Sequence, residues 1–140
     1  MNGMNNILIV GAHFDDAELG AGATAAKLVD KGKNVYKITL TDNVTRFQEK
    51  KIIVDYESSL EQSKRACDIL GVKQLQFEAV ACNHLEYNTL IMQKIEKTIY
   101  EYNIDTIFMH FSSDMNQDHI AASKICLTAA RHCRNIFYYQ

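Results

Sequence analysis

Two short polar stretches of the chain carry residues that could bind a metal ion. The first is Gly11-Ala12-His13-Phe14-Asp15-Asp16, in which an imidazole precedes two carboxylates, and the second runs from His110 to His119. Imidazole nitrogen and carboxylate oxygen are ligands that zinc accepts, and a site with three protein ligands keeps a position open for water or substrate. We therefore expect His13, Asp16 and His119 to form a catalytic metal site.

Both stretches follow apolar runs that we expect to be strands. Five such runs predict strands, at residues 7–10, 35–40, 74–77, 106–110 and 136–139. Patterns of helical period predict four helices, at residues 17–31, 56–70, 90–102 and 118–133. Residues 41–54 are polar, and we expect a long loop there.

Strands that alternate with helices predict an α/β fold, here a Rossmann-like three-layer αβα arrangement with a mainly parallel sheet of about five strands. In such sheets ligands bind beyond the carboxyl ends of the strands, near the point where the strand order reverses. If the order is 3-2-1-4-5, the first and fourth strands are neighbours. The loops that carry His13 and His119 then face each other.

Length and composition limit the remaining choices. The 140 residues fit one domain, and we expect a single domain over residues 1–140. A net charge of −2 and a pI near 6.2 argue against a nucleic-acid binder or a polybasic membrane anchor. The apolar run at residues 7–10 is too short for a signal peptide or a transmembrane segment, and the four cysteines form no C-x-x-C pair. We expect a reduced, cytoplasmic protein.

A dinucleotide site at the first stretch is disfavoured. The G-x-G-x-x-G fingerprint needs glycines where this chain has His13 and Asp16. Their side chains would block the backbone from approaching a pyrophosphate, and the two aspartates would repel it.

The first stretch resembles the Ala-His-Pro-Asp-Asp-x-Glu signature of the LmbE/PIG-L family of zinc-dependent N-acetylglucosaminyl deacetylases, with residues 12–18 in the matching positions. Residues 110–119 resemble the second signature of that family, which ends in Pro-Asp-His or Gln-Asp-His. Residues 57–72 are similar to the helix between the two signatures. The resemblance spans nearly the whole chain in the right order.

This resemblance implies a role for each matching residue. His13, Asp16 and His119 would bind zinc, and Asp15 would be the general base that takes a proton from the metal-bound water. The implied reaction is hydrolysis of the N-acetyl group of an amino sugar, either a small molecule or a sugar linked to a lipid or carrier. Zinc lowers the pKa of bound water to about 7, and a free carboxylate beside it can accept the proton.

The chain departs from the family pattern at two positions. Phe14 replaces a proline, so the rigidity of the turn must come from packing. Asn116 replaces a histidine of many members; it can donate a hydrogen bond to an oxyanion but cannot donate a proton near pH 7. Asp15, Asp114 or His110 could then be the acid, although a strand-end His110 that bonds only to the backbone is equally consistent with the sequence.

Three further residues are candidates for substrate contacts. Asp42 lies near the end of the second expected strand, Arg46 lies in the polar loop after it, and His84 follows the third. For Arg46 and His84 a solvated loop residue is the favoured interpretation. Family domains usually continue past the fifth strand, so we expect a C-terminally short domain whose pocket a homo-oligomer could complete.

Two other functions remain open. The short chain and Asn116 also fit a metal-binding but catalytically idle domain that acts with a partner. Two histidines and one carboxylate are also the ligand set of non-haem Fe(II) enzymes, so the metal could be iron instead of zinc.

Overall fold

The computed structural model describes residues 3–47, 49 and 52–140. Its main sheet contains five parallel strands, β1 (Asn6–Gly11), β2 (Asn34–Thr39), β5 (Lys73–Gln74), β6 (Thr106–His110) and β7 (Asn135–Tyr139). Their order is β5-β2-β1-β6-β7, which is the 3-2-1-4-5 arrangement in which the first and fourth expected strands are neighbours. Four helices cover the sheet, α1 (Asp16–Asp30), α2 (Tyr56–Leu70), α3 (Thr89–Glu101) and α4 (Gln117–Ala129).

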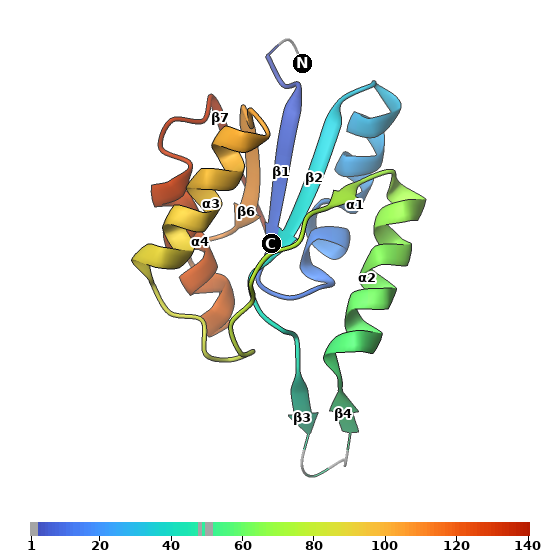
Figure 1. Cartoon of the computed structure of the whole chain (residues 1–140), viewed down its shortest axis with the longest axis vertical. Coiled ribbons are helices and arrows are strands. Elements are labelled where there is room, and N and C mark those ends of the chain that lie inside the picture. The colour runs from blue at the N-terminus through green and yellow to red at the C-terminus, as the bar shows by residue number, and fades with distance from the viewer. Residues whose placement is uncertain (1–2, 48, 50–51) are drawn as a thin grey trace.

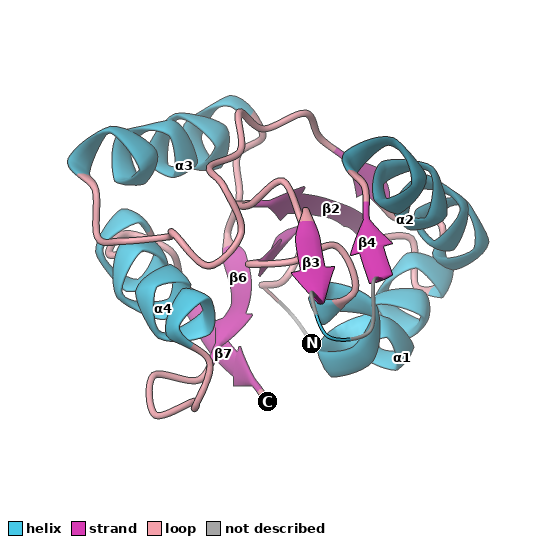
Figure 2. Cartoon of the chain, turned by 90° about the horizontal axis from the view of Figure 1, so that it is seen from below, coloured by secondary structure: helices cyan, strands magenta, loops and turns pink. Residues whose placement is uncertain are grey.

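The helices form two layers, with α1 and α2 on one face of the sheet and α3 and α4 on the other (Figures 1 and 2). The central strand β1 alternates between the two cores because successive side chains of a strand point to opposite faces. Leu8 and Val10 pack against α3 and α4, and Ile7 and Ile9 pack against α1 and α2. The expected three-layer αβα fold is therefore confirmed.

The stretch expected to be a loop, residues 41–54, contains a hairpin. Strands β3 (Thr45–Phe47) and β4 (Ile52–Val54) pair antiparallel, with Thr45 opposite Val54. Figure 1 shows the hairpin projecting from the end of the sheet at which the strands finish. The prediction was wrong here because three-residue strands are too short to show a recognisable alternation. The third strand is also shorter than expected, since β5 ends at Gln74.

The described part of the chain includes no helix that is long and apolar enough to cross a membrane.

A buried lysine holds the turn that follows β1. Lys37 of β2 is 1% exposed, and its ammonium donates hydrogen bonds to the carbonyl oxygen of Phe14 (2.5 Å) and to the hydroxyl of Ser63 (2.8 Å). The same nitrogen forms an ion pair with Glu18 at 2.5 Å. Phe14 stands where the resembled family has proline. The hydrogen bond from Lys37 to the Phe14 carbonyl restrains the backbone of this turn, as the proline ring would have done. Nothing in the sequence pattern of the strand indicated this role.

Gly20 and Gly22 lie on the same helix but differ in their surroundings. A methyl group at Gly20 would overlap the ring of Tyr139, whose hydroxyl donates to the carbonyl of Val10 at 2.6 Å. The nearest atom to a methyl group at Gly22 belongs to Leu70, at an ordinary 3.8 Å. Of these two positions, Gly20 is therefore the one at which the packing requires a residue without a side chain.

We expect Gly20→Ala to lower the free energy of unfolding by about 1–3 kcal/mol, because the ring of Tyr139 must move. Gly22→Ala is the matched control and should be neutral or stabilising by up to about 1 kcal/mol, since alanine favours the helix. Urea denaturation of both variants measures the difference. Equal stabilities would contradict the close packing of Gly20 on Tyr139.

We expect Lys37→Met to cost about 3–5 kcal/mol of unfolding free energy, because Glu18 would keep a charge without its buried partner. Adding Glu18→Gln should recover part of the loss, since the unpaired charge disappears. Urea denaturation of the single and double variants tests this. A Lys37→Met protein as stable as the wild type would show that the ammonium is not needed.

Candidate metal centre

The two polar stretches meet at the carboxyl edge of the sheet. His13 follows β1 and Asp16 begins α1, whereas His119 lies in the first turn of α4, after β6. Because β1 and β6 are hydrogen-bonded neighbours, their loops face each other. One ligand atom from each of His13, Asp16 and His119 lies within 4.8 Å of the other two. The structure thus brings together the three residues expected to bind the metal.

One nitrogen of each histidine and both carboxylate oxygens of Asp16 lie close together. Nδ1 of His13 lies 3.2 Å from Nε2 of His119, and the latter lies 3.2 Å from Oδ1 of Asp16. Oδ2 of Asp16 lies 3.5 Å from Nδ1 of His13. Ligand atoms around a tetrahedral zinc ion are about 3.3 Å apart, given bond lengths of about 2.0 Å. The donor types and their spacing therefore fit such an ion.

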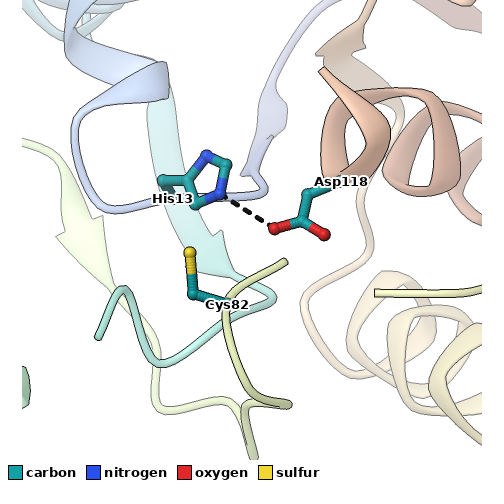
Figure 3. A group of neighbouring side chains, drawn as sticks. All are labelled: His13, Cys82 and Asp118. Atoms are coloured by element: carbon teal, nitrogen blue, oxygen red, sulfur yellow. Dashed lines mark hydrogen bonds and ion pairs between the residues drawn. The ribbon is translucent and has the colours of Figure 1, made fainter. Parts of the chain in front are cut away.

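The outward nitrogen of each histidine bonds to a carboxylate. Nε2 of His13 lies 3.0 Å from Oδ2 of Asp118, as Figure 3 shows, and Nδ1 of His119 lies 3.0 Å from Oδ2 of Asp114. Metal-binding histidines typically make this second contact, which fixes the tautomer and the orientation of the ring. The arrangement leaves Nδ1 of His13 and Nε2 of His119 as the free ligand atoms.

Asp118 is a functional residue that the sequence reasoning missed. Its side chain is fully buried and also accepts hydrogen bonds from the backbone N–H groups of Asn83 (2.7 Å) and Leu85 (3.1 Å). Its signal in the sequence was its match to the aspartate beside the final histidine of the second signature. Asp118, from the stretch after β6, thus accepts a hydrogen bond from His13, in the loop after β1. This contact can be recognised only when both segments are placed in space.

The charges of the centre change the protonation of its histidines. Burial lowers the pKa of His119, but hydrogen bonds and charges from Asp16 and Asp114 outweigh it and raise this pKa to about 9. Burial likewise opposes charge on His13, yet Asp16 and Asp118 raise its pKa above the usual value. Burial disfavours the Asp16 anion, but hydrogen bonds from three histidines hold its pKa well below the usual range. The metal-free centre therefore holds protons that a cation would displace.

His110 is buried against two members of the triad, His119 and Asp16. It is 2% exposed, its ring stacks on that of His119 at 3.9 Å between centroids, and its Nε2 lies 3.0 Å from Oδ2 of Asp16. The same nitrogen lies 3.0 Å from the backbone nitrogen of Ala12. This position favours holding the ligands in place over transferring a proton to substrate.

Asn116 and Asp114, two other candidates for catalysis, have structural partners. The side-chain oxygen of Asn116 caps α4 by accepting from the backbone N–H groups of Asp118 (2.8 Å) and His119 (3.3 Å). A contact with an oxyanion would therefore have to use its amide nitrogen. Asp114 bonds to His119, which favours an orienting role for its carboxylate.

Asp15, the candidate base, has an exposed side chain. It occupies the N-cap position of α1 without a capping hydrogen bond from its carboxylate. It lines a cleft of about 420 Å³ between α1, α2 and β4, together with Phe14, Leu19 and Val54. A carboxylate that is not used for capping is available for proton transfer.

The three substrate candidates are less closely tied to the centre. Oδ1 of Asp42 accepts hydrogen bonds from the backbone N–H groups of Val44 (3.0 Å) and Cys82 (2.9 Å), which favours a structural role. His84 has an exposed side chain in a turn closed by its N–H and the carbonyl of Ala81. Arg46 belongs to β3, but its side chain lies outside the described residues.

The raised pKa of His119 predicts how the stability of the metal-free protein depends on pH. Its folded pKa of about 9 exceeds the unfolded value near 6.5, so the stabilisation is complete below about pH 6.5 and is lost as the pH rises towards 9. We expect the thermal midpoint of chelator-treated protein to fall over this interval, and His119→Asn to flatten the fall. Differential scanning calorimetry measures both, and parallel pH profiles for the two proteins would contradict the assignment.

Comparison with known proteins finds a matching family and two relatives that are named deacetylases. The family model described as GlcNAc-PI de-N-acetylase (PIG-L) matches residues 8–130. The uncharacterized deacetylase YaiS of Escherichia coli (strain K12) is 31% identical over an alignment of 146 positions. The alignment covers 99% of this chain and 75% of YaiS. The diacetylchitobiose deacetylase of Thermococcus kodakarensis is 30% identical over 101 residues, 70% of this chain and 38% of that protein.

Solved structures confirm the fold. The 4-carboxy-2-hydroxymuconate hydratase GalB from Pseudomonas putida KT2440 superposes with a TM-score of 0.79 at 19% identity, over 91% of this chain and 56% of GalB. GalB is named for a hydration reaction, so the shared fold does not by itself define the chemistry. The chain spans between 49% and 66% of three of the solved structures that it resembles. From the match over residues 8–130 and the identity to YaiS, the chain belongs to the PIG-L family of de-N-acetylases.

Proposed function

We propose that the protein is a zinc-dependent hydrolase that removes the N-acetyl group from an amino sugar or a sugar conjugate. His13, Asp16 and His119 would hold the metal. The observation that carries this proposal is the convergence of their three ligand atoms, while the outer nitrogen of each histidine bonds to a carboxylate. Membership of a de-N-acetylase family supports the reaction type.

Zinc bound at the triad would supply an activated water molecule and polarise the amide carbonyl. Asp15 would accept the proton of the attacking water and then donate it to the leaving nitrogen. The water oxygen adds to the carbonyl carbon, the C–N bond breaks, and acetate and a free amine leave. Asp16 cannot share this work because its carboxylate belongs to the triad, which explains why two adjacent aspartates are needed.

The other residues of the centre would position these groups. Asp118 and Asp114 hold the rings of His13 and His119, and His110 supports Asp16 from below. The amide nitrogen of Asn116 is the group that could donate a hydrogen bond to the developing oxyanion. We assign proton transfer to Asp15 and positioning to the other residues of the centre.

An N-acetylated sugar is the substrate class that we favour. The relative from Thermococcus kodakarensis is named for deacetylation of diacetylchitobiose, an N-acetyl sugar. In this chain the cleft beside Asp15 has both polar and apolar walls, with Asn43 and Gln62 as well as Phe14 and Val54.

We expect Asp15→Asn to reduce acetate release at least about 100-fold and to leave the bound metal in place, because a general base contributes about 10²–10⁴ in rate. Asp16→Asn is the matched control and should lose the metal. Acetate release from a panel of N-acetyl sugars and the metal content of both proteins are measured together. A metal content that falls with activity in Asp15→Asn would mean that Asp15 is a ligand.

Metal analysis of protein purified without oxygen also separates the remaining alternatives. Stoichiometric zinc with acetate release supports the proposed hydrolase. Stoichiometric iron would favour the non-haem iron class, and zinc without acetate release from any sugar would favour a catalytically idle domain.

A further inference from the structure

His13 presents its two ring nitrogens to two different groups of ligands. Nδ1 faces His119 and Asp16, the other members of the proposed zinc triad. On the other side, ligand atoms of His13, Cys82 and Asp118 all lie within 4.8 Å of one another, and Nε2 of His13 is 3.0 Å from Asp118. Figure 3 shows the thiol and the carboxylate on the side of the imidazole that carries Nε2.

Cys82 is held in this position by its backbone. Its N–H donates to Oδ1 of Asp42 at 2.9 Å, and its thiol is 3.7 Å from the hydroxyl of Thr45. The residue is 9% exposed, so the thiol faces inward. Cys67 and Cys126 lie within α2 and α4 and Cys133 follows α4.

We propose that His13, Cys82 and Asp118 form a second cation site, which binds a thiophilic divalent ion such as Zn²⁺ or Cd²⁺ when that ion is in excess. Imidazole nitrogen, thiolate sulfur and carboxylate oxygen are together a zinc ligand set. Around a tetrahedral zinc ion, a thiolate sulfur and a nitrogen or oxygen ligand are about 3.5 Å apart, so the group must contract by up to about 1.3 Å. The three side chains are otherwise already in place and largely withdrawn from solvent.

Binding at this site has a defined proton balance. The cation replaces the proton that Nε2 of His13 shares with Asp118, and the thiol of Cys82 releases its proton on binding. The backbone N–H groups of Asn83 and Leu85 continue to hold the carboxylate of Asp118. Because contraction and proton loss both oppose binding, the second site fills at higher cation concentrations than the triad.

Occupation of the second site would inhibit the proposed hydrolase, and this part of the inference rests on the proposed function. The cation removes the hydrogen bond from His13 to Asp118 that fixes the imidazole. Because the ring then carries a cation on each nitrogen, the two cations also repel each other. The affinity of the triad for its own metal falls as a result.

Cadmium reports the second site directly, because a cadmium–thiolate bond gives a charge-transfer band in the near ultraviolet. Protein that already holds one equivalent of Zn²⁺ is titrated with Cd²⁺, without substrate. We expect the band in the wild type and in Cys133→Ser, the control for a thiol elsewhere. In Cys82→Ser the band should be lost, because serine has no thiolate to bind the cadmium. Thermal midpoints of the three proteins confirm that each is folded.

A band of unchanged amplitude in Cys82→Ser, or no band in the wild type at millimolar cadmium, would overturn the proposal. If Cys82→Ser is unfolded, Cys82→Ala and Asp118→Asn replace it in the same titration. The readout needs no turnover, so a protein that shows the band but releases no acetate would refute the hydrolase and leave the cation site standing. Where acetate is released, Cys82→Ser should tolerate at least about 10-fold more Zn²⁺ than the wild type.

Discussion

The pairing of β1 with β6 is the constraint on which the centre depends. The two strands lie side by side with Ile7 opposite Thr106 and Ile9 opposite Phe108, although about a hundred residues separate them in the chain. Each strand ends in a loop with a histidine, and the proposed triad of His13, Asp16 and His119 takes its ligands from both loops. The apolar packing of β1 on both faces thus fixes the distance between two sets of polar side chains.

A second level of structure surrounds the triad. Asp114, Asp118 and His110 each contact a member of the triad. Lys37 donates a hydrogen bond to the backbone of the turn that joins His13 to Asp16. Among these residues, the carboxylate of Asp114, together with Asp16, raises the pKa of His119. The same electrostatic balance that raises the pKa of His119 makes its ring a place where a cation can replace a proton.

Much of this arrangement could be predicted from the sequence. The apolar runs predicted that strands and helices alternate, and the rule that ligands gather at the carboxyl edge placed His13, Asp16 and His119 together for the order 3-2-1-4-5. Local pattern carried no sign of Lys37, because a charged residue in a buried strand looks like an edge position until its partners are known. The role of Asp118 was hidden for a similar reason, since its three partners come from two other segments.

Asp118 joins His13, a proposed metal ligand, to the loop at Asn83 and Leu85 by way of main-chain N–H groups. The link therefore depends on the path of the backbone and is indifferent to the side chains that the loop displays. Those side chains can diversify without disturbing the ligand beneath them. Members of such a family can therefore differ in the side chains of this loop while the proposed ligand atoms keep their geometry.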